Sequence, residues 1–301
     1  MTAARLSVAS WLRWIAVLAL VGIVGLCAAV VGVGLLLSAP ARFVVGAPPA
    51  DLNAESVEFQ SASGATVRGW FVAGRAGGGA VVLRHGLRAN RLSMVRRAQL
   101  LKAEGYAVLL VDFQAHGEST GSRITFGHLE GRDAAAAVAL VRLRLPNEKI
   151  GVIGTSLGGA AALLGSLAAD AYVLEAVYPN IGAATANRIS VVLGTRIGAL
   201  ASKLLVPLFE FLMSPILGVT PADLQPIGQI ADIGAPVLLL GGMSDNRTPP
   251  EETTALFERA HAPKYIWLIQ GAGHVDLEQY APELYREHVL GFLSRALRPG
   301  S

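Results

Sequence analysis

The stretch from Lys149 to Ala162 reads Lys-Ile-Gly-Val-Ile-Gly-Thr-Ser-Leu-Gly-Gly-Ala-Ala-Ala. It predicts an apolar strand from Ile150 to Ile153, a tight turn that contains Ser156, and an alanine-rich helix. The turn has the G-x-S-x-G pattern of a nucleophile elbow, in which a strained serine is held out at the end of a strand. Gly154 and Gly158 are the small residues that such a turn requires. An ordinary strand-to-helix connection in a Rossmann-like sheet fits the motif alone equally well.

The composition of the 301-residue chain excludes several function classes. Only 16% of the residues are charged, 52% are hydrophobic, and the net charge is +3 with no basic run. Nucleic-acid binding therefore has no support. Cys27 is the single cysteine, so neither an internal disulfide nor a cysteine-based metal site is expected. The length predicts one large domain and an additional segment.

The additional segment is an uncharged run from Trp14 to Leu37, rich in Val, Leu, Ala and Gly. As a helix it would span about 36 Å, enough for a hydrocarbon core of ~30 Å. We predict a transmembrane anchor over residues 14–38. A signal peptide cleaved at Ala39-Pro40-Ala41 is the alternative, although the apolar run is long for that role.

Positive charge is biased toward the N-terminal side of this run. Arg5 and Arg13 precede it, and only Arg42 closely follows it. We therefore predict a single-pass protein of the cell membrane whose domain lies on the extracytoplasmic side. The proline-containing segment after the run predicts an extended linker. The predicted organisation is an N-terminal flank at 1–13, the anchor at 14–38, the linker at 39–55 and a domain at 56–301.

Strands alternate with helices through most of the domain. Strands are expected at Ser56–Gln60, Val67–Ala73, Ala80–Leu83, Ala107–Val111, Ile150–Ile153, Tyr172–Val177, Val237–Leu240 and Tyr265–Ile269. Helices are expected at Ser93–Glu104, Asp133–Leu145, Glu251–Ala260 and Pro282–Arg298, and after the elbow. The alternation predicts an α/β fold with a mostly parallel sheet covered by helices on both faces. Ligands bind such sheets at the C-terminal ends of the strands.

Residues with catalytic potential follow five of the predicted strands. In chain order these are His85-Gly86-Leu87, Asp112 to Ser119, Ser156, Asp245 and His274. A serine, an acid and a histidine on separate loops are the set that nucleophilic catalysis requires. Chance alone is a poor reason for all these residues to follow strand ends, so a shared site explains their positions better.

These motifs resemble those of the α/β-hydrolases, and most closely those of the serine aminopeptidase-like branch of bacterial esterases, lipases and thioesterases. The resemblance runs from about Val57 to Arg298 and includes the chain order Ser, Asp, His. It implies an α/β-hydrolase fold and a serine nucleophile. The family pattern D-x-R-G-H-G-x-S reads Asp112-Phe113-Gln114-Ala115-His116-Gly117-Glu118-Ser119 here, with Gln114-Ala115 in place of Arg-Gly. That element is structural in the family, so the departure concerns loop detail.

The chemistry then assigns roles to the individual residues. Ser156 would be the nucleophile, His274 the base that takes its proton, and Asp245 the acid that orients the imidazole. The backbone N–H groups of Leu87 and Leu157 would form the oxyanion hole. No metal or organic cofactor is implied.

Other polar residues are weaker candidates for these roles. The rival acids are Glu251 and Glu252, which open a predicted helix, and Asp276, which is close to His274 in sequence. Asp112 is expected to tie down its own loop. We interpret His85 and His116 as structural, hydrogen-bonding residues.

The alternation breaks down between Asn180 and Ile233, where we predict a helical lid over about residues 180–233. Tyr178, Phe209 and Phe211 are predicted to contact the substrate, although packing is the simpler role for Tyr178. A second transmembrane pass is the alternative for this apolar segment. Pro207 and the charged residues Arg196, Lys203 and Glu210 argue against a transmembrane pass. The three charged residues recur every seven positions, which places them on one helical face and leaves the other faces apolar.

The complete Ser–Asp–His set predicts a serine hydrolase that cleaves an ester, thioester or amide through an acyl-enzyme. The apolar lid favours a small-molecule or lipid-like substrate with a hydrophobic acyl group, as in carboxylesterases and lipases. A catalytically silent binding or scaffold protein with the same fold, at the membrane, is the alternative.

Overall fold

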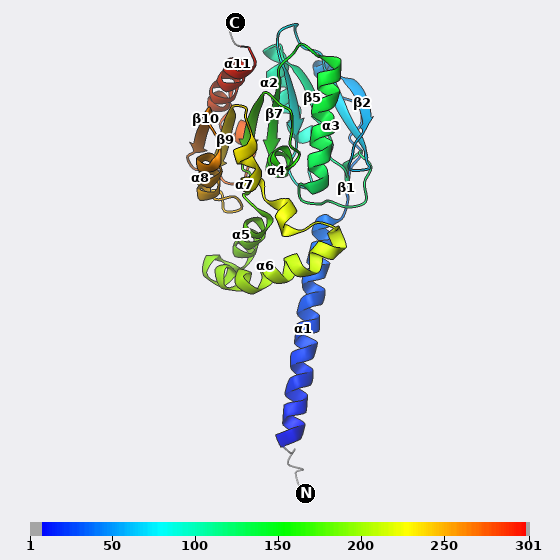
Figure 1. Ribbon diagram of the computed structural model, residues 1–301, viewed down its shortest axis with the longest axis vertical. Helices are drawn as coiled ribbons and strands as arrows, with labels where there is room; N and C mark the ends of the chain where they lie inside the picture. The colour runs from blue at the N-terminus through cyan, green and yellow to red at the C-terminus, as the bar shows by residue number, and fades with distance from the viewer. Residues whose placement is uncertain (1–7, 299–301) are drawn as a thin grey trace.

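The computed structural model of the chain describes residues 8–298. Within this range the centre is an eight-stranded sheet with the order β10-β9-β8-β7-β4-β5-β3-β2 (Figure 1). Its strands are β2 (Glu55–Gln60), β3 (Thr66–Val72), β4 (Ala80–Arg84), β5 (Ala107–Val111), β7 (Ile150–Thr155), β8 (Ala171–Glu175), β9 (Val237–Gly242) and β10 (Lys264–Ile269). β3 is antiparallel to β2 and to β5, and the other pairs are parallel. The C-terminal ends of β4, β5 and β7 to β10 therefore meet at one edge.

Helices cover both faces of this sheet, and each face has its own apolar core. The helices of the domain are α2 (Val95–Ala103), α3 (His128–Arg144), α4 (Leu157–Leu164), α8 (Pro250–Arg259), α9 (Leu277–Tyr280), α10 (Pro282–Tyr285) and α11 (Gly291–Leu297). α3, α4 and α8 pack on side chains such as Val152, whereas α2 and α11 pack on side chains such as Ile153. Neighbouring strand residues point to opposite faces, which places these two in different cores. The predicted fold class is confirmed.

Two helices of the domain differ from their predicted bounds by more than two residues or by an interruption. The expected helix Pro282–Arg298 consists of α10, a π-helical turn at Arg286–Leu290 and α11. α3 begins at His128 rather than Asp133, because the Glu130 carboxylate accepts hydrogen bonds from the N–H groups of Thr125 (2.9 Å) and Gly127 (2.8 Å). Such bonds satisfy free donors near the start of a helix.

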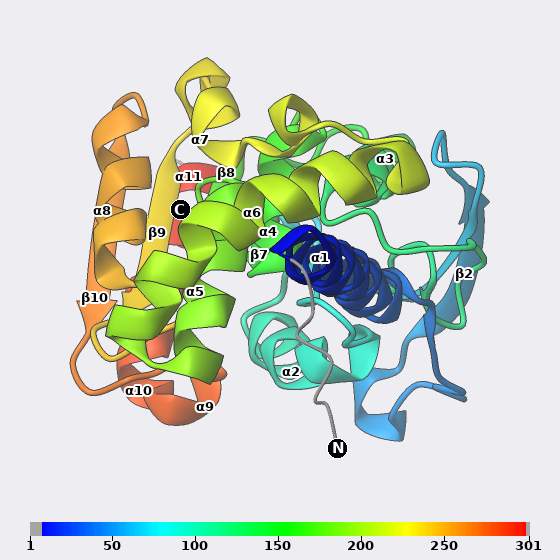
Figure 2. The same ribbon diagram turned by 90° about the horizontal axis from the view of Figure 1, so that it is seen from below.

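The predicted anchor forms a single helix, α1 (Val8–Ser38), which projects from one end of the domain (Figure 1). The predicted N-terminal flank lies partly outside the described residues, and Arg5 is among those outside. The segment after β8 is helical, as predicted for the lid: it contains α5 (Ile181–Leu193), α6 (Thr195–Leu217), η3 (Pro221–Leu224), α7 (Pro226–Gln229) and η4 (Ile230–Asp232). α5 and α6 lie on the side of the domain from which α1 leaves (Figures 1 and 2). By length and composition, α1 and α6 are the two helices among the described residues that could cross a membrane.

The segment predicted as an extended linker is docked on the domain. β1 (Ala41–Arg42) pairs in parallel with β6 (His116–Gly117), a short strand in the loop after β5. A 3₁₀ turn, η1 (Ala50–Leu52), follows, and Leu52 is fully buried. The connection between α1 and the sheet is therefore a fixed part of the fold.

Candidate active site

Ser156 lies in the sharp turn between β7 and α4. Its backbone has φ 51° and ψ −110°, a positive-φ conformation that residues other than glycine adopt only with strain. A Cβ atom on Gly154 would lie 2.4 Å from the carbonyl oxygen of Gly158, and one on Gly158 would lie 2.4 Å from that of Arg84. The close approach of the backbone therefore requires both glycines of the motif, and the turn presents Ser156 at the end of its strand.

Asp245 and His274 come together from the loops after β9 and β10. His274 Nδ1 lies 2.8 Å from Asp245 Oδ2. Because a carboxylate only accepts, Nδ1 donates this hydrogen bond, and Nε2 remains the basic nitrogen. No hydrogen bond joins His274 to Ser156 within residues 8–298. Hydrogen bonds of this kind often tighten only when a substrate is in place.

Thr248 is a further member of this group that the sequence-based prediction missed. Its hydroxyl donates to Asp245 Oδ2 at 2.7 Å and lies 3.2 Å from His274 Nδ1. The N–H groups of Arg247 (2.8 Å) and Thr248 (2.9 Å) donate to the other oxygen, Oδ1. An acidic residue that accepts from the two or three residues after it is a recognised turn signal, so the Asp-x-x-Thr spacing could have indicated this role.

The surroundings of Asp245 keep its carboxylate ionised. Burial acts to raise its pKa, but the hydrogen bonds from His274 and Thr248 outweigh that effect, so the pKa of Asp245 lies below its usual value. An ionised Asp245 stabilises the positive charge that His274 acquires when it takes a proton.

The rival acids have other partners. Glu252 accepts a hydrogen bond from the Asn187 side chain at 2.6 Å, and burial raises the pKa of Glu252 to about 7. Asp276 caps α9 and lies 2.9 Å from the Arg97 guanidinium. Glu251 is exposed.

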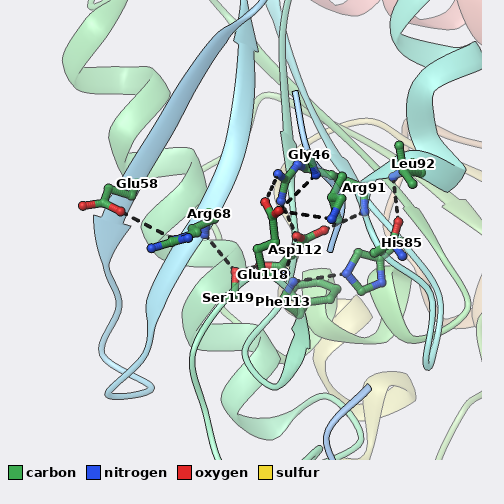
Figure 3. Close-up of polar contacts among 12 residues, drawn as sticks. Gly46, Glu58, Arg68, His85, Arg91, Leu92, Asp112, Phe113, Glu118 and Ser119 are labelled. Atoms are coloured by element: carbon green, nitrogen blue, oxygen red, sulfur yellow. Dashed lines mark hydrogen bonds and ion pairs between the residues drawn. The ribbon is translucent and has the colours of Figure 1, made fainter. Parts of the chain in front are cut away.

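Asp112 ties down the loop that follows β5 (Figure 3). Its carboxylate accepts hydrogen bonds from the N–H groups of Arg91 (2.7 Å) and Glu118 (3.0 Å) and pairs with the Arg91 guanidinium, which also pairs with Glu118. The hydroxyl of Ser119 donates to the Asp112 carbonyl at 2.7 Å. Burial of this cluster raises the pKa of Asp112, against the pull of Arg91. The cluster supports the sheet edge beside Ser156.

The loop after β4 runs alongside the nucleophile. A Cβ atom on Gly86 would lie 3.8 Å from Ser156 Cβ, and Leu87 follows directly. Leu87 and Leu157 line the cavity that contains Ser156. In the part of the chain that the structure describes, neither of their N–H groups donates a hydrogen bond. Two free N–H groups beside a serine are what a developing oxyanion requires.

His85 and His116 bridge the loops on this edge as neutral rings. His85 Nδ1 donates to the Gly86 carbonyl (2.8 Å) and its Nε2 accepts from the Phe113 N–H (3.1 Å). His116 is held in the same way, between the Gln114 carbonyl (2.9 Å) and the Arg88 N–H (3.1 Å). Burial lowers the pKa of His85 to about 3, so this ring stays uncharged at neutral pH.

The departure at Gln114-Ala115 is accommodated by the structure. Ala115 has φ +58°, a conformation that favours glycine, which is the residue of the family pattern. Gln114 is buried, and its side-chain amide donates to Glu130 Oε1 (2.7 Å) and to the Arg123 carbonyl (2.5 Å). Its N–H donates to Asp133 at 2.7 Å. Gln114 therefore joins the loop to two buried acids of α3, Glu130 and Asp133, without adding a cation.

Ser156 opens into a largely apolar cavity of about 520 Å³. Tyr178 lies in its wall, with its hydroxyl donating to the Phe126 carbonyl at 2.7 Å, and Phe209 of α6 also lines it. The prediction for Phe211 is corrected, because its side chain is 77% exposed and lies outside the cavity lining. Residues two positions apart on a helix point to different sides, so Phe209 and Phe211 do not share a face.

A second cavity, of about 650 Å³, lies among Lys149, Asp170 and Asp232 near the opposite, amino ends of the strands. None of the predicted site residues lines it. Within residues 8–298, no group of three or more His, Cys, Asp or Glu side chains could hold a metal ion.

Comparisons with known proteins agree with this fold. The family model described as serine aminopeptidase, S33, matches residues 76–214, a span that contains Ser156 and ends before Asp245 and His274. YqkD of Bacillus subtilis is 26% identical over 239 residues, which cover 77% of this chain and 77% of that protein. The α/β hydrolase domain-containing protein WAV2 of Arabidopsis thaliana is 29% identical over 262 residues, which cover 82% and 81%.

Solved structures show the same architecture. The esterase Pf2001 of Pyrococcus furiosus superposes with a TM-score of 0.70 at 26% identity and covers 87% of this chain and 98% of that chain. The α/β hydrolase GrgF from a Penicillium species shares the fold, with a TM-score of 0.63 at 20% identity, covering 81% and 99%. The sequence matches, the strand order and the serine elbow together show that the chain has the α/β-hydrolase fold, and they support a hydrolase.

Proposed function

We propose that this hydrolase uses Ser156 as a nucleophile and cleaves carboxylic esters with a hydrophobic acyl group. One arrangement carries the proposal: the strained serine lines an apolar cavity together with Leu87 and Leu157, whose N–H groups are free, and the hydrogen-bonded Asp245–His274 pair lies on loops at the same edge of the sheet. The family match and the esterase neighbour support hydrolysis as the type of reaction.

In the first half-reaction, His274 Nε2 takes the hydroxyl proton of Ser156 as Oγ attacks the ester carbonyl carbon. The N–H groups of Leu87 and Leu157 stabilise the oxyanion of the tetrahedral intermediate. The intermediate collapses by breaking the bond to the alkoxy oxygen, and His274 gives its proton to that oxygen. An alcohol leaves, and the acyl group remains on Ser156.

In the second half-reaction, a water molecule attacks the acyl-enzyme and loses a proton to His274. A second tetrahedral intermediate forms and breaks the bond to Ser156 Oγ, which receives the proton from His274. The carboxylic acid is released, and the free serine is restored. Asp245 holds the imidazole by Nδ1 through both halves.

A fluorophosphonate probe tests this proposal, because it labels only an activated serine. The full-length protein should be labelled at Ser156 and should hydrolyse acyl esters, and Ser156→Ala should lose both properties while keeping its fold. His274→Ala should be nearly as damaging, since the two residues act as a unit. Labelling or turnover at the wild-type level in Ser156→Ala would contradict the proposal. A wild type that is neither labelled nor active would favour the silent scaffold instead.

We also propose that α1 anchors the enzyme in the cell membrane, with the domain on the extracytoplasmic side. Trp14, Leu18 and Val21 of α1 are 59%, 67% and 63% exposed. Apolar surface of this extent is unfavourable in water and is accommodated in lipid. The arginines that precede the run support the orientation.

A further inference from the structure

We propose that the acyl-binding pocket is shared between the hydrolase domain and α1, and that its occupant is the acyl chain of an ester lipid drawn from the bilayer. This inference rests on the proposed serine hydrolase and specifies the source and class of its substrate. It gives α1 a part in the active site beyond that of a tether.

One stripe of α1 forms part of the pocket wall. Leu26, Ala29, Val30, Val33 and Leu37 line the cavity that contains Ser156. Their spacing, i, i+3, i+4, i+7 and i+11, places them on a single face of the helix. A tether has no need of a continuous face toward the active-site cavity.

This stripe reaches deep along α1. Leu26 lies about 18 Å of helical rise below Ser38, the last residue of α1, and the hydrocarbon core is ~30 Å thick. With the C-terminal end of α1 at the membrane surface, the lower part of the pocket lies at the depth of the lipid acyl chains. The same cavity contains Ser156 and Leu157, so it connects that depth with the nucleophile.

The lid helices supply the opposite wall. Ile189 and Val192 of α5 line the cavity together with Leu205 and Phe209 of α6. α6 runs across α1 rather than along it (Figures 1 and 2). The two helices touch at Gly34, where a Cβ atom would lie 2.3 Å from Met213 Sδ. If α1 follows the membrane normal, α6 lies in the plane of the membrane surface and is not a second transmembrane pass.

α6 turns another apolar stripe away from the protein. Ile197, Leu200, Leu204 and Phe211 are 67%, 71%, 62% and 77% exposed, and their spacing places them on one face. Lys203 lies beside this stripe and is also exposed. An exposed apolar face with a charged flank is typical of helices that lie in the membrane interface. A lid held there would let an acyl chain enter between α1 and α6 without crossing water.

The wall that α1 provides is fixed to the domain. The N–H of Ile124 donates to the Ser38 carbonyl at 2.7 Å, and the N–H of Ala41 donates to the Ala115 carbonyl at 2.7 Å. In each bond one residue lies at or just after the end of α1, and the other lies in the segment between β5 and α3. The α1 side of the pocket is therefore held by the domain itself and does not depend on the lid.

Two neighbouring alanines of α1 provide a matched test. Both side chains are exposed, but Ala29 lines the pocket and Ala28 does not. Full-length wild type, Ala29→Trp and Ala28→Trp are purified in detergent and assayed with p-nitrophenyl butanoate and dodecanoate. We expect the dodecanoate-to-butanoate ratio of kcat/KM to fall about tenfold or more in Ala29→Trp, because the indole occupies space needed by the long chain, and to stay unchanged in Ala28→Trp.

A second arm identifies the source of the ester. The same proteins are reconstituted in phosphatidylcholine vesicles that contain a diacylglycerol with one fluorogenic long acyl chain. Wild type and Ala28→Trp should hydrolyse the embedded ester, and Ala29→Trp should not. A wild type that cleaves the dodecanoate in detergent and leaves the embedded ester intact would overturn entry from the bilayer.

Fluorophosphonate labelling of Ser156 shows whether each variant keeps a folded site. If Ala29→Trp loses labelling, a second pair of variants replaces Ala29→Trp and Ala28→Trp. The pocket variant is then Val33→Phe, and its control is Val24→Phe on the other side of α1. Equal chain-length ratios in a labelled pocket variant and its control would overturn the shared pocket. A wild type that is neither labelled nor active would instead refute the serine hydrolase on which the inference rests.

Discussion

The guanidinium of Arg88 donates a hydrogen bond to the main-chain carbonyl of Leu36 at 3.1 Å. The same nitrogen, Nη1, also donates to the Ala39 carbonyl at 3.1 Å. Leu36 lies in the last turn of α1, where carbonyl acceptors lack intrahelical partners, and Ala39 directly follows the helix. Arg88 directly follows Leu87, a proposed oxyanion donor, so one residue joins the end of α1 to the oxyanion loop.

Replacing Arg88 by Met should weaken that connection while keeping the aliphatic stem. We expect kcat for butanoate to fall about tenfold, less than the ~10²–10³-fold of losing a whole oxyanion donor, with KM nearly unchanged. A lower kcat with an unchanged KM is expected if the N–H of Leu87 acts mainly in the transition state. Arg68→Met is the control, because Arg68 is exposed and pairs with Glu58 on an edge strand. A rise in KM with constant kcat would contradict this role for Arg88.

Asp245→Asn should be severely damaging, because the amide favours the wrong imidazole tautomer. We expect kcat to fall by about 10³–10⁴-fold, by analogy with the triads of serine proteases. Glu251→Gln is the matched control at an exposed rival acid. Near-wild-type kcat in Asp245→Asn would show that another group orients His274.

Thr248→Val should have an intermediate effect. It removes the hydroxyl that donates to Asp245 at 2.7 Å while keeping the side-chain shape. One lost hydrogen bond to a charged group is worth about 1.5–3 kcal/mol, so kcat/KM should fall by about 10–100-fold. Thr254→Val on α8 is the control, since its hydroxyl donates to the Pro250 carbonyl within the helix. Equal activities in the two variants would remove Thr248 from the catalytic group.

Phe209→Ser and Phe211→Ser should separate the two sides of α6. Phe209 lines the cavity, so its loss should reduce turnover of long acyl esters more than that of acetate esters. Phe211 is exposed, so its loss should leave the chain-length profile in detergent unchanged. Measuring kcat/KM for esters of graded chain length checks both results. Identical profiles for the two variants would contradict the orientation of α6.

Asp133 should make folding stability depend on pH. Its side chain is fully buried, and burial raises its pKa from 3.8 to about 6, against hydrogen bonds from Ser61 and Ser63. Because the pKa of Asp133 is higher in the folded state, its protonated carboxyl group contributes to the free energy of unfolding. This contribution is fully present below pH 3.8 and is lost as the pH rises through about 6. Asp133→Asn removes this loss, so its stability relative to wild type should increase by about 2–3 kcal/mol across that interval.

Urea unfolding of the full chain in detergent, repeated over a series of pH values, measures this difference. Asp51→Asn is the control, because Asp51 is exposed. Parallel pH profiles for wild type and Asp133→Asn would show that Asp133 does not hold its proton more tightly in the folded state.

The proposed orientation in the membrane is also open to a direct test. Protease added outside intact cells, or outside spheroplasts where an outer membrane is present, should digest the hydrolase domain. Protection in intact cells, with digestion only after lysis, would reverse the orientation.

Local signals predicted much of this molecule, and the reasons are physical. A strained elbow requires Gly154 and Gly158, and buried parallel strands read as apolar runs such as Ala107–Val111, whose predicted and observed bounds agree. Because parallel strands end at a common edge, Ser156, Asp245 and His274 could be predicted to share a site before their contacts were known.

Features that depend on distant contacts left no local signal. α1 is apolar on every side, so no contrast marks the stripe around Val30 that faces the pocket. The lid has apolar residues on two faces, which is why Phe209 and Phe211 were not distinguished. Arg88 resembles any loop arginine until the end of α1 is placed beside it.

Only Ala39 and Pro40 separate α1 from β1, the short strand that pairs with the loop beside the active site. In a chain anchored by α1, so short a connection holds Ser156 at a constant height above the bilayer midplane. The enzyme would then select its substrates by the depth of their ester bonds as well as by their chemical structure. Ester bonds that lie deeper in the bilayer, or farther out on a large headgroup, would be out of reach of Ser156. Its search would be two-dimensional, and its rate would follow the surface density of the lipid rather than a concentration in solution.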